Sequence, residues 1–243
     1  YKFWINDADG FLRDTSTDRI RNTDGPGYIW SALLAENHPD FKMLLADRIY
    51  KNFFNDGAMT PAAIDARLVA RMDEIRDSFL AESARWGYLS PSNWESKADT
   101  IRADMFPYRT DELISQWRAN GFLPSFDPPG FNQYGGSVLE GFQPVITSSD
   151  GTVFYTLDGS DPRLPGGGIS ASAHIWVAGA VTVTEDLTLK VRVRASDGTW
   201  SALADPHFLV GLRQPPLPGD LLVSEINYNP HGSDEYEFIE VWN

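Results

Sequence analysis

The hydrophobic pattern changes once along the chain, from a helical spacing in the first half to an alternating one in the second. Between residues 28 and 120, apolar side chains recur every three or four positions, as on one face of an α-helix. We expect five helices, near 28–36, 39–54, 61–86, 92–106 and 110–120. The longest apolar stripe is typical of core packing and consists of Ile64, Leu68, Met72, Ile75 and Phe79.

Capping and turn-forming residues set the expected ends of these helices. Thr60 precedes a proline and carries the side chain of an N-cap. The run 92–95 has a serine three residues before a glutamate, which is the spacing of a capping box. Gly87 is expected to terminate the long helix. Pro107 is expected to end the fourth helix, near 92–106, and Thr110 is expected to begin the fifth.

From Gln143 onward the period is two, which indicates β-strands. In the run 187–194, apolar residues alternate with polar ones, so Lys190, Arg192 and Arg194 are predicted to lie on one solvent-facing side of a strand. Turn residues separate this run from its neighbours. We expect strands near 143–148, 153–158, 173–178, 180–184, 187–195 and 206–211.

Proline- and glycine-rich segments divide the chain. One lies between residues 124 and 136 and the other spans 214–219. The expected fold class is therefore a multidomain α+β arrangement, with a helical N-terminal unit, an antiparallel β-sandwich and a short β tail. We expect the unit boundaries to be 1–131, 132–213 and 214–243.

The segment 153–163 reads Val-Phe-Tyr-Thr-Leu-Asp-Gly-Ser-Asp-Pro-Arg. Its β-branched and aromatic run stops at Asp-Gly and turns again at Asp-Pro, pairs that favour tight turns. The segment resembles the signature of the chitobiase/β-hexosaminidase C-terminal domain, over roughly residues 133–213. That resemblance implies a small immunoglobulin-like β-sandwich of extracellular bacterial proteins, and it implies no reaction.

The tail contains two further strand-like runs, 221–230 and 237–243. The first contains Ser-Glu-Ile and Asn-Pro, and the second begins Glu-Phe-Ile-Glu. Together they resemble the first two strands of a lamin-tail domain. Two strands are too few to bury a core, so we expect the tail to dock on the rest, to be disordered or to pair with a neighbour through its edge.

Several short stretches stand out in the helical half, beginning with Phe-Trp-Ile-Asn-Asp-Ala-Asp at 3–9. The others are 25–26, 37–41, 46–54 and 82–86. In this order they resemble the C-terminal portion of a CotH-like kinase, the spore-coat protein H family. The order of the three resemblances also matches large predicted surface proteins of environmental bacteria.

The kinase resemblance implies a magnesium site. Asp7 matches the metal-binding aspartate of the family, and Asp9 is a possible second carboxylate, although Asn6 departs from the tryptophan usual before that aspartate. Mg²⁺ favours one or two carboxylates beside nucleotide phosphates. The nucleotide-binding lobe and the catalytic aspartate of such a kinase would lie upstream of Tyr1. Mg²⁺ and ATP are therefore cofactors of a longer parent protein if it is a kinase, and this chain alone is expected to hold neither.

The same run, 6–10, has two other interpretations. An EF-hand alignment would put Ile5 at loop position one and Ser16 at position twelve, so both charged ends would be missing. An Asx-rich turn explains the run by its turn chemistry alone. The carboxylates of 158–163 have the same two interpretations, calcium or turn, and the turn is favoured, with Arg163 pairing either Asp158 or Asp161.

Flat aromatic side chains raise the possibility of sugar binding. Trp176 and Trp200, with Tyr155 and His174, would provide a platform on which sugar rings stack. A β-sandwich also needs large aromatic residues inside, so core packing is the favoured interpretation.

Composition narrows the function classes. The net charge of −14 argues against a nucleic-acid partner, which needs a basic face. The chain has no cysteine, so it has no disulfide and no zinc–thiolate site. No apolar run reaches the length that spans a bilayer, and residues 1–20 do not have a signal-peptide profile, so a signal for export would lie outside this chain.

The sequence therefore favours a non-catalytic C-terminal section of a large secreted or cell-surface bacterial protein. We expect an architectural or interaction role, with a carbohydrate or another surface protein as the partner. The alternative is the C-terminal part of a CotH-like kinase. The four histidines are scattered and no nucleophile motif accompanies them, so we assign no catalytic residue.

Overall fold

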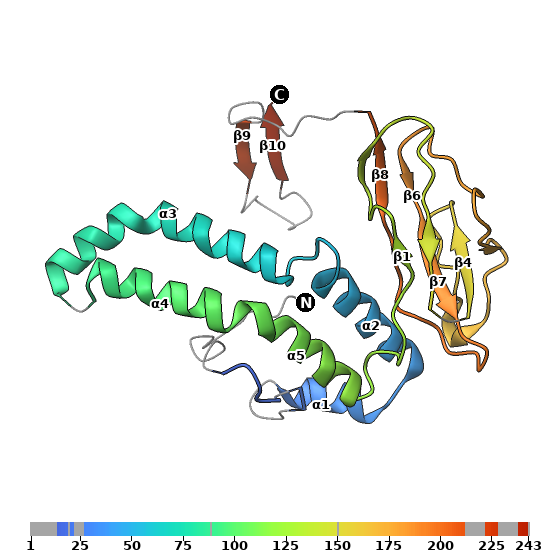
Figure 1. Cartoon of the computed structure of the whole chain (residues 1–243), viewed down its shortest axis with the longest axis horizontal. Coiled ribbons are helices and arrows are strands. Elements are labelled where there is room, and N and C mark those ends of the chain that lie inside the picture. Colours follow the sequence, from blue (N-terminus) through green and yellow to red (C-terminus); the bar gives the residue numbers. More distant parts are fainter. Residues whose placement is uncertain are drawn as a thin grey trace.

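The computed structural model describes residues 14–18, 20–21, 27–87, 89–149, 151–211, 222–227 and 238–242. Its helices are α1 (Gly27–Ala35), α2 (Pro39–Phe53), α3 (Pro61–Trp86), α4 (Pro91–Asp104) and α5 (Phe106–Ala119), as Figure 1 shows. The strands are β1 (Gly130–Phe131), β2 (Gly136–Val138), β3 (Ile146–Thr147), β4 (Thr152–Thr156), β5 (His174–Ile175), β6 (Leu187–Thr188), β7 (Lys190–Arg194), β8 (His207–Val210), β9 (Leu222–Asn227) and β10 (Phe238–Trp242). These elements confirm the α+β class.

The helices form where the apolar spacing predicts them, but the caps of α3 and α4 differ from those expected. α4 begins at Pro91, and the hydroxyl of Ser90 accepts the backbone N–H of Asn93 at 3.3 Å, so the expected capping box at 92–95 is not the cap. Thr60 precedes α3 without capping it, because its hydroxyl donates to the carbonyl of Gly57 at 2.9 Å.

α5 starts four residues earlier than expected. Phe106 is its first residue, so Pro107 lies in the first turn and Thr110 lies inside the helix. Proline is well tolerated in a first turn, where its missing N–H has no helical partner to lose. The prediction that the helix would begin at Thr110 was therefore wrong, and α4 and α5 are separated by Met105 alone.

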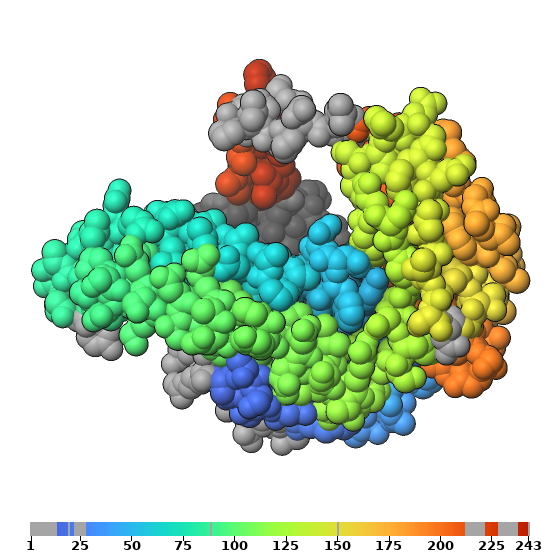
Figure 2. Space-filling model, in the orientation of Figure 1, coloured from blue at the N-terminus to red at the C-terminus, as the bar shows by residue number. Residues whose placement is uncertain are grey.

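α3 and α4 form an arm that extends away from the sheets (Figures 1 and 2). No residue of α3 is fully buried. Its apolar stripe is half-buried against α4 and α5, and Ile75 is 38% exposed. Phe79 stacks on Trp94 of α4 with ring centroids 4.6 Å apart. The stripe packs the helices together as expected, but it does not reach a closed core.

The β part contains two three-stranded sheets, ordered β2-β8-β6 and β5-β4-β7, and a small β1-β3 pair. β4 pairs antiparallel with both neighbours, so the central strand of the signature segment is confirmed. β2 pairs with β8 in parallel, so the expected wholly antiparallel arrangement was wrong for this pair. The strand expected at 180–184 is a single bridge between Val183 and Phe142, because the chain there pairs at one position only.

The largest correction concerns the predicted wet face of 187–195. This run is split into β6 and β7, and Arg192 on the polar face is only 1% exposed. The alternation was right about which residues share a face, but α2 covers the face at this point.

The main core joins the two halves of the chain. One apolar cluster contains Ala46 and Tyr50 of α2 together with Tyr155 and Val191 of one sheet and Phe208 of the other. A second cluster lies among the helices and contains residues such as Leu34 and Phe122. The helical half thus contributes one face of α2 to the core of the β part, across the boundary expected near residue 131. The division into three units stays a prediction.

The two tail strands that the sequence predicts are present, and β9 and β10 pair antiparallel with each other. Their apolar side chains remain exposed, for example Ile239 at 64% and Trp242 at 68%. Among the helices that the structure describes, none has the length and apolar character to cross a membrane.

Candidate functional site

The magnesium candidates Asp7 and Asp9 lie outside the described residues. Within the described ranges, no three His, Asp or Glu side chains gather in a group that could hold a metal ion.

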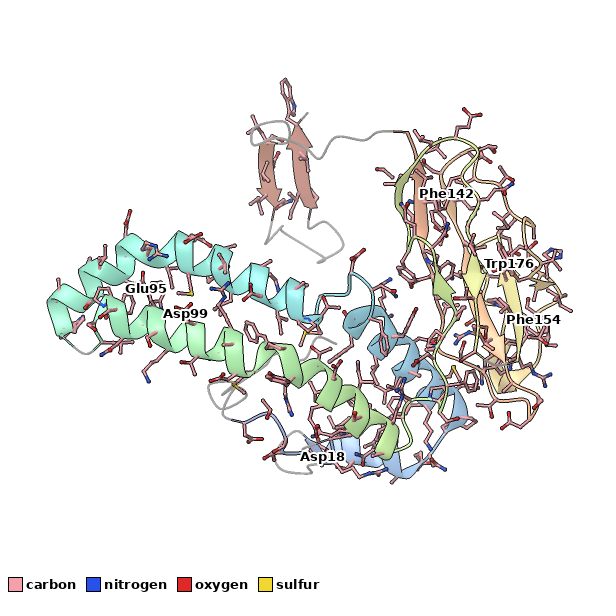
Figure 3. The ribbon with its side chains drawn as sticks, in the orientation of Figure 1. Asp18, Glu95, Asp99, Phe142, Phe154 and Trp176 are labelled. Carbon is pink, nitrogen blue, oxygen red and sulfur yellow. The ribbon has the colours of Figure 1, made fainter. Side chains whose placement is uncertain are left out.

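The two sugar-binding candidates have different environments. Trp200 is 3% exposed, its Nε1–H donates to the carbonyl of Gly167 at 2.8 Å, and its ring lies 5.6 Å from that of Phe154. These contacts support the core interpretation for Trp200 and leave little of its ring accessible. Trp176, labelled in Figure 3, is half-buried. Its ring meets that of Tyr155 edge to face, with the centroids 5.4 Å apart.

The turn after β4 is held by its own aspartates. Asp158 accepts the backbone N–H of Ser160 at 2.9 Å and its hydroxyl at 2.5 Å. These hydrogen bonds lower the pKa of Asp158 to about 2. Asp161 accepts the backbone N–H of Arg163 at 2.8 Å. Both carboxylates thus make the local bonds that turn chemistry requires.

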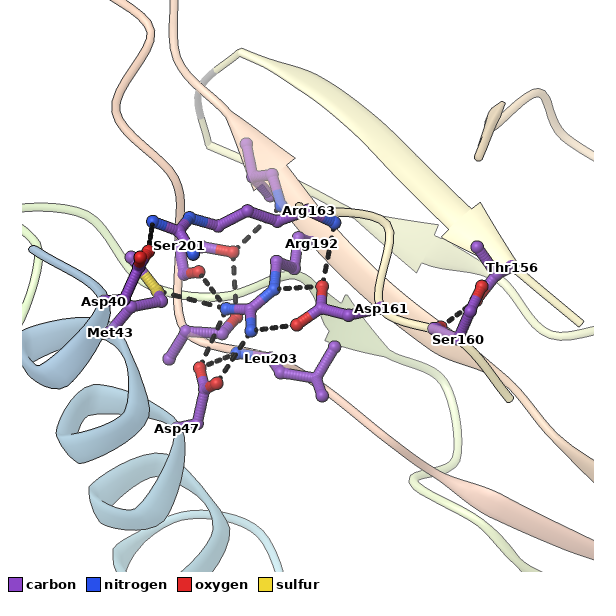
Figure 4. Close-up of polar contacts among 12 residues, drawn as sticks. Asp40, Met43, Asp47, Thr156, Ser160, Asp161, Arg163, Arg192, Ser201 and Leu203 are labelled. Atoms are coloured by element: carbon purple, nitrogen blue, oxygen red, sulfur yellow. Dashed lines mark hydrogen bonds and ion pairs between the residues drawn. The ribbon is translucent and has the colours of Figure 1, made fainter. Parts of the chain in front are cut away.

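Arg192 lies at the centre of the most connected polar group in the described chain (Figure 4). Its Nε and Nη2 donate to the two oxygens of Asp161 at 2.7 and 2.6 Å. Its Nη1 and Nη2 donate to the two oxygens of Asp47 at 2.8 and 2.7 Å. Nη1 also donates to the carbonyl of Ser201 at 2.8 Å. We call Arg192, Asp47, Asp161 and Ser201 the Arg192 cluster.

Four separate segments supply this cluster, and Ser201 comes from the one between β7 and β8. Arg192 belongs to β7, Asp161 to the turn that follows β4, and Asp47 to α2. Asp47 also accepts the backbone N–H of Leu203 at 2.8 Å. The carboxylate of one helix residue therefore binds two segments of the β part.

A second ion pair lies beside the cluster. Nη2 of Arg163 donates to Oδ1 of Asp40 at 2.5 Å, and the N–H of Gly166 lies 3.1 Å from both oxygens of the same carboxylate. The prediction that Arg163 would pair its side chain with Asp158 or Asp161 was wrong. A helix residue is its partner, because α2 lies against this loop (Figure 4).

The electrostatics of the cluster favour its charged form. Burial opposes ionisation of Asp161, but the hydrogen bonds and charge of Arg192 outweigh burial and hold the pKa of Asp161 below its ordinary value. Burial also disfavours the charged guanidinium, and the bonds to Asp161 and Asp47 reverse that effect, so the pKa of Arg192 is raised. For Asp40, the hydrogen bond from Arg163 is the main cause of a lowered pKa.

The geometry fits a structural junction better than a reaction centre. Nε, Nη1 and Nη2 of Arg192 all donate to protein acceptors, and the side chain is almost fully buried. A guanidinium in this state has no accessible donor for a ligand.

Sequence reasoning missed this cluster, although a signal was present. Asp40 and Asp47 are seven residues apart, which places them on the same face of α2. Arg163 and Arg192 lie in the predicted turn and strand of the β part. Two carboxylates on one helix face could therefore bind these arginines and dock the helix on the β part.

The chain was compared with family models, curated proteins and solved structures, and nothing in any of the three sets matches it.

Proposed function

We propose that this chain is a non-catalytic C-terminal section of a large secreted or cell-surface bacterial protein, with an architectural role. Its helical half and its β half act as one rigid body that fixes the arm α3–α4 relative to the sheets. The observation that supports this proposal is the Arg192 cluster, in which a buried arginine and two aspartates join α2 to β7 and to the turn after β4.

Two features make the junction stiff. Two carboxylates bind one planar guanidinium, each through two oxygens, which fixes direction as well as distance. The apolar side of the same helix lies in the main core through Ala46 and Tyr50. Moving α2 would therefore expose apolar area and separate buried charges at the same time.

We also propose that the two three-stranded sheets are the layers of an immunoglobulin-like sandwich of the chitobiase C-terminal type. Support comes from the shared cluster, where Tyr155 and Val191 of one sheet pack with Val138 and Phe208 of the other. The CotH-like origin of the helices and the lamin-tail-like origin of β9 and β10 belong to the same proposal and rest on the sequence resemblances. A carbohydrate or another surface protein is the proposed partner.

Calorimetric titration with Mg²⁺ and ATP separates this proposal from the kinase alternative. The isolated chain is expected to give no heat of binding. Heat that disappears in Asp7→Ala would contradict the proposal and favour a magnesium site at 6–10. A matched exposed variant, Asp73→Asn, controls for a general loss of negative charge, because Asp73 lies on the arm and not near residue 7 in the sequence.

The architectural role has its own test. Denaturant unfolding followed by far-ultraviolet circular dichroism reports on the helices, and tryptophan fluorescence reports in part on Trp200 in the β part. A rigid body predicts coincident transitions by the two probes. Two transitions with separate midpoints would contradict it.

A further inference from the structure

The far end of the arm carries a second site, independent of the proposed architectural role. A depression of about 350 Å³ opens there, lined by Phe79, Glu82, Ser83, Trp86 and Leu89. Four of these residues recur at three- and four-residue spacing on α3 and so share one helix face. We call this depression the tip pocket. The C-terminal end of α3, whose residues line the pocket, is the part of the helices farthest from the sheets in Figure 1.

The pocket exists because the apolar stripe of α3 continues beyond the helix that covers it. Trp94 of α4 stacks on Phe79, whereas Trp86, two turns further along, is 63% exposed. Leu89, in the segment after α3, also lines the pocket. Its carbonyl accepts the hydroxyl of Ser83 at 2.7 Å, so the loop is tied to the helix that forms the floor.

The chemistry of the lining is aromatic with one acid. Phe79 and Trp86 present π-systems, and Glu82 is the one ionisable residue among the lining residues that the structure describes. Within the described parts of the chain, the carboxylate of Glu82 takes part in no ion pair or hydrogen bond. The guanidinium of Arg85 lies 4.9 Å from the centre of the Trp86 ring, so this ring already attracts one cation.

We propose that the tip pocket binds a small quaternary ammonium molecule of the choline type. Aromatic faces attract cations, and methylated ammonium groups in particular, because their methyl groups also pack against apolar surface. The carboxylate of Glu82 supplies the counter-charge. The volume lies in the range of small-molecule sites, which are mostly apolar with a few polar groups.

Charge complementarity selects this ligand over a neutral one. A neutral apolar molecule would use the rings of Phe79 and Trp86 and leave the charge of Glu82 unmatched. A simple metal ion would need several oxygen ligands, and the side chains of the described lining offer one carboxylate and one hydroxyl, that of Ser83.

The test compares choline with 3,3-dimethyl-1-butanol, which has the same shape but a carbon in place of the charged nitrogen. Calorimetry on the full chain is expected to detect choline and to find the neutral analogue about tenfold weaker or worse. Trp86→Ala is expected to abolish choline binding, and Glu82→Gln to weaken it about tenfold. Trp86 and Glu82 are exposed, so both variants are expected to keep the fold, which circular dichroism checks.

Two further variants sharpen the test. Arg85→Gln removes a competing cation from the Trp86 ring and is expected to tighten choline binding. Glu74 is an acidic residue of α3 outside the pocket, so Glu74→Gln is expected to leave the affinity for choline unchanged. Sedimentation with phosphatidylcholine vesicles tells whether the same group is also taken from a lipid. Equal binding of choline and its neutral analogue, or unchanged choline binding in both Trp86→Ala and Glu82→Gln, would overturn the proposal.

Discussion

Arg192 of β7 and Asp47 of α2 are 145 residues apart in the sequence, yet two parallel hydrogen bonds of 2.8 and 2.7 Å join them. The arginine side chain is 1% exposed and that of the aspartate 20%. A bidentate pair in this environment resists both rotation and separation, because either movement leaves a buried charge without a partner. This pair joins α2 to β7, beside the Asp40–Arg163 pair and the apolar contacts of Ala46 and Tyr50.

Removal of the arginine is the first prediction. Arg192→Met keeps much of the side-chain volume but leaves Asp47 and Asp161 without a counter-charge, so we expect a loss of about 3–5 kcal/mol in the free energy of unfolding. Urea denaturation measures it. Arg102 provides a matched control, since it binds Asp65 through the same two-bond geometry, but both side chains are over one-third exposed.

Arg102→Met is expected to change the free energy of unfolding far less than Arg192→Met, since exposed ion pairs contribute little. Similar losses for the two arginine variants would show that burial of the Arg192 cluster does not matter.

The second prediction concerns the stability of the fold at acidic pH. The pKa of Asp161 is lowered in the folded state, so its contribution to stability is complete above the pKa of the unfolded chain and is lost as the pH falls through the folded value. Stability is therefore expected to decline below about pH 5. Asp161→Asn removes this contribution, and its stability should change less with pH than that of the unmodified chain. Urea midpoints between neutral and acidic pH measure the difference.

Other carboxylates also titrate in that range, among them Asp197, whose pKa is lowered chiefly by the backbone N–H of Thr199. Asp197→Asn is the control, because it shows how much of the pH dependence comes from an aspartate that binds only within its own turn. If Asp161→Asn had the same pH dependence as the unmodified chain, the assigned role of Asp161 would be wrong.

Ser201 provides the third prediction. It is fully buried, and its hydroxyl accepts the backbone N–H of Val193 at 2.8 Å and donates to the carbonyl of Ala202 at 2.9 Å. Ser201→Ala leaves these two buried groups without that partner, so we expect a loss of about 1–3 kcal/mol. The exposed Ser96→Ala should stay within about 0.5 kcal/mol. Equal effects in chemical denaturation would contradict the assignment.

Two glycines allow steric crowding to be separated from backbone strain in a fourth prediction. Gly135 and Gly159 both have positive φ, 73° and 78°. A Cβ on Gly135 would lie 2.7 Å from the carbonyl oxygen of His207, whereas one on Gly159 would meet nothing within 4 Å. We expect Gly159→Ala to cost about 1–2 kcal/mol, from strain alone, and Gly135→Ala about 2–4 kcal/mol, measured by denaturation. A larger loss at Gly159 would contradict the packing of β2 on β8.

The sequence predicted the helices and most strands because their signals are local. Apolar spacing placed α2 and α3, and Asp-Gly and Asp-Pro pairs placed the turn at 158–162. The start of α5 was missed for a local reason as well, because Pro107 is compatible with a first turn and with a break, and only the neighbouring packing decides between them.

The Arg192 cluster was missed for a different reason. Alternation along β7 shows which side chains share a face, but not what covers that face. Arg192 on a solvated face and Arg192 beneath a helix give the same pattern. The residue that pairs with Arg192 is Asp47 of α2, 145 residues away in the sequence. A pairing at that separation produces no periodic pattern in the sequence.

Hydrogen exchange of the native protein tests the central claim, that the Arg192 cluster makes the two halves one rigid body. We expect the slowly exchanging amides of α2 and β7 to share one free energy of opening, and Arg192→Met to lower both by the same amount. If the amides of α2 open at a clearly lower free energy than those of β7, and Arg192→Met changes neither, the helix is not locked to the sheet and the account is wrong.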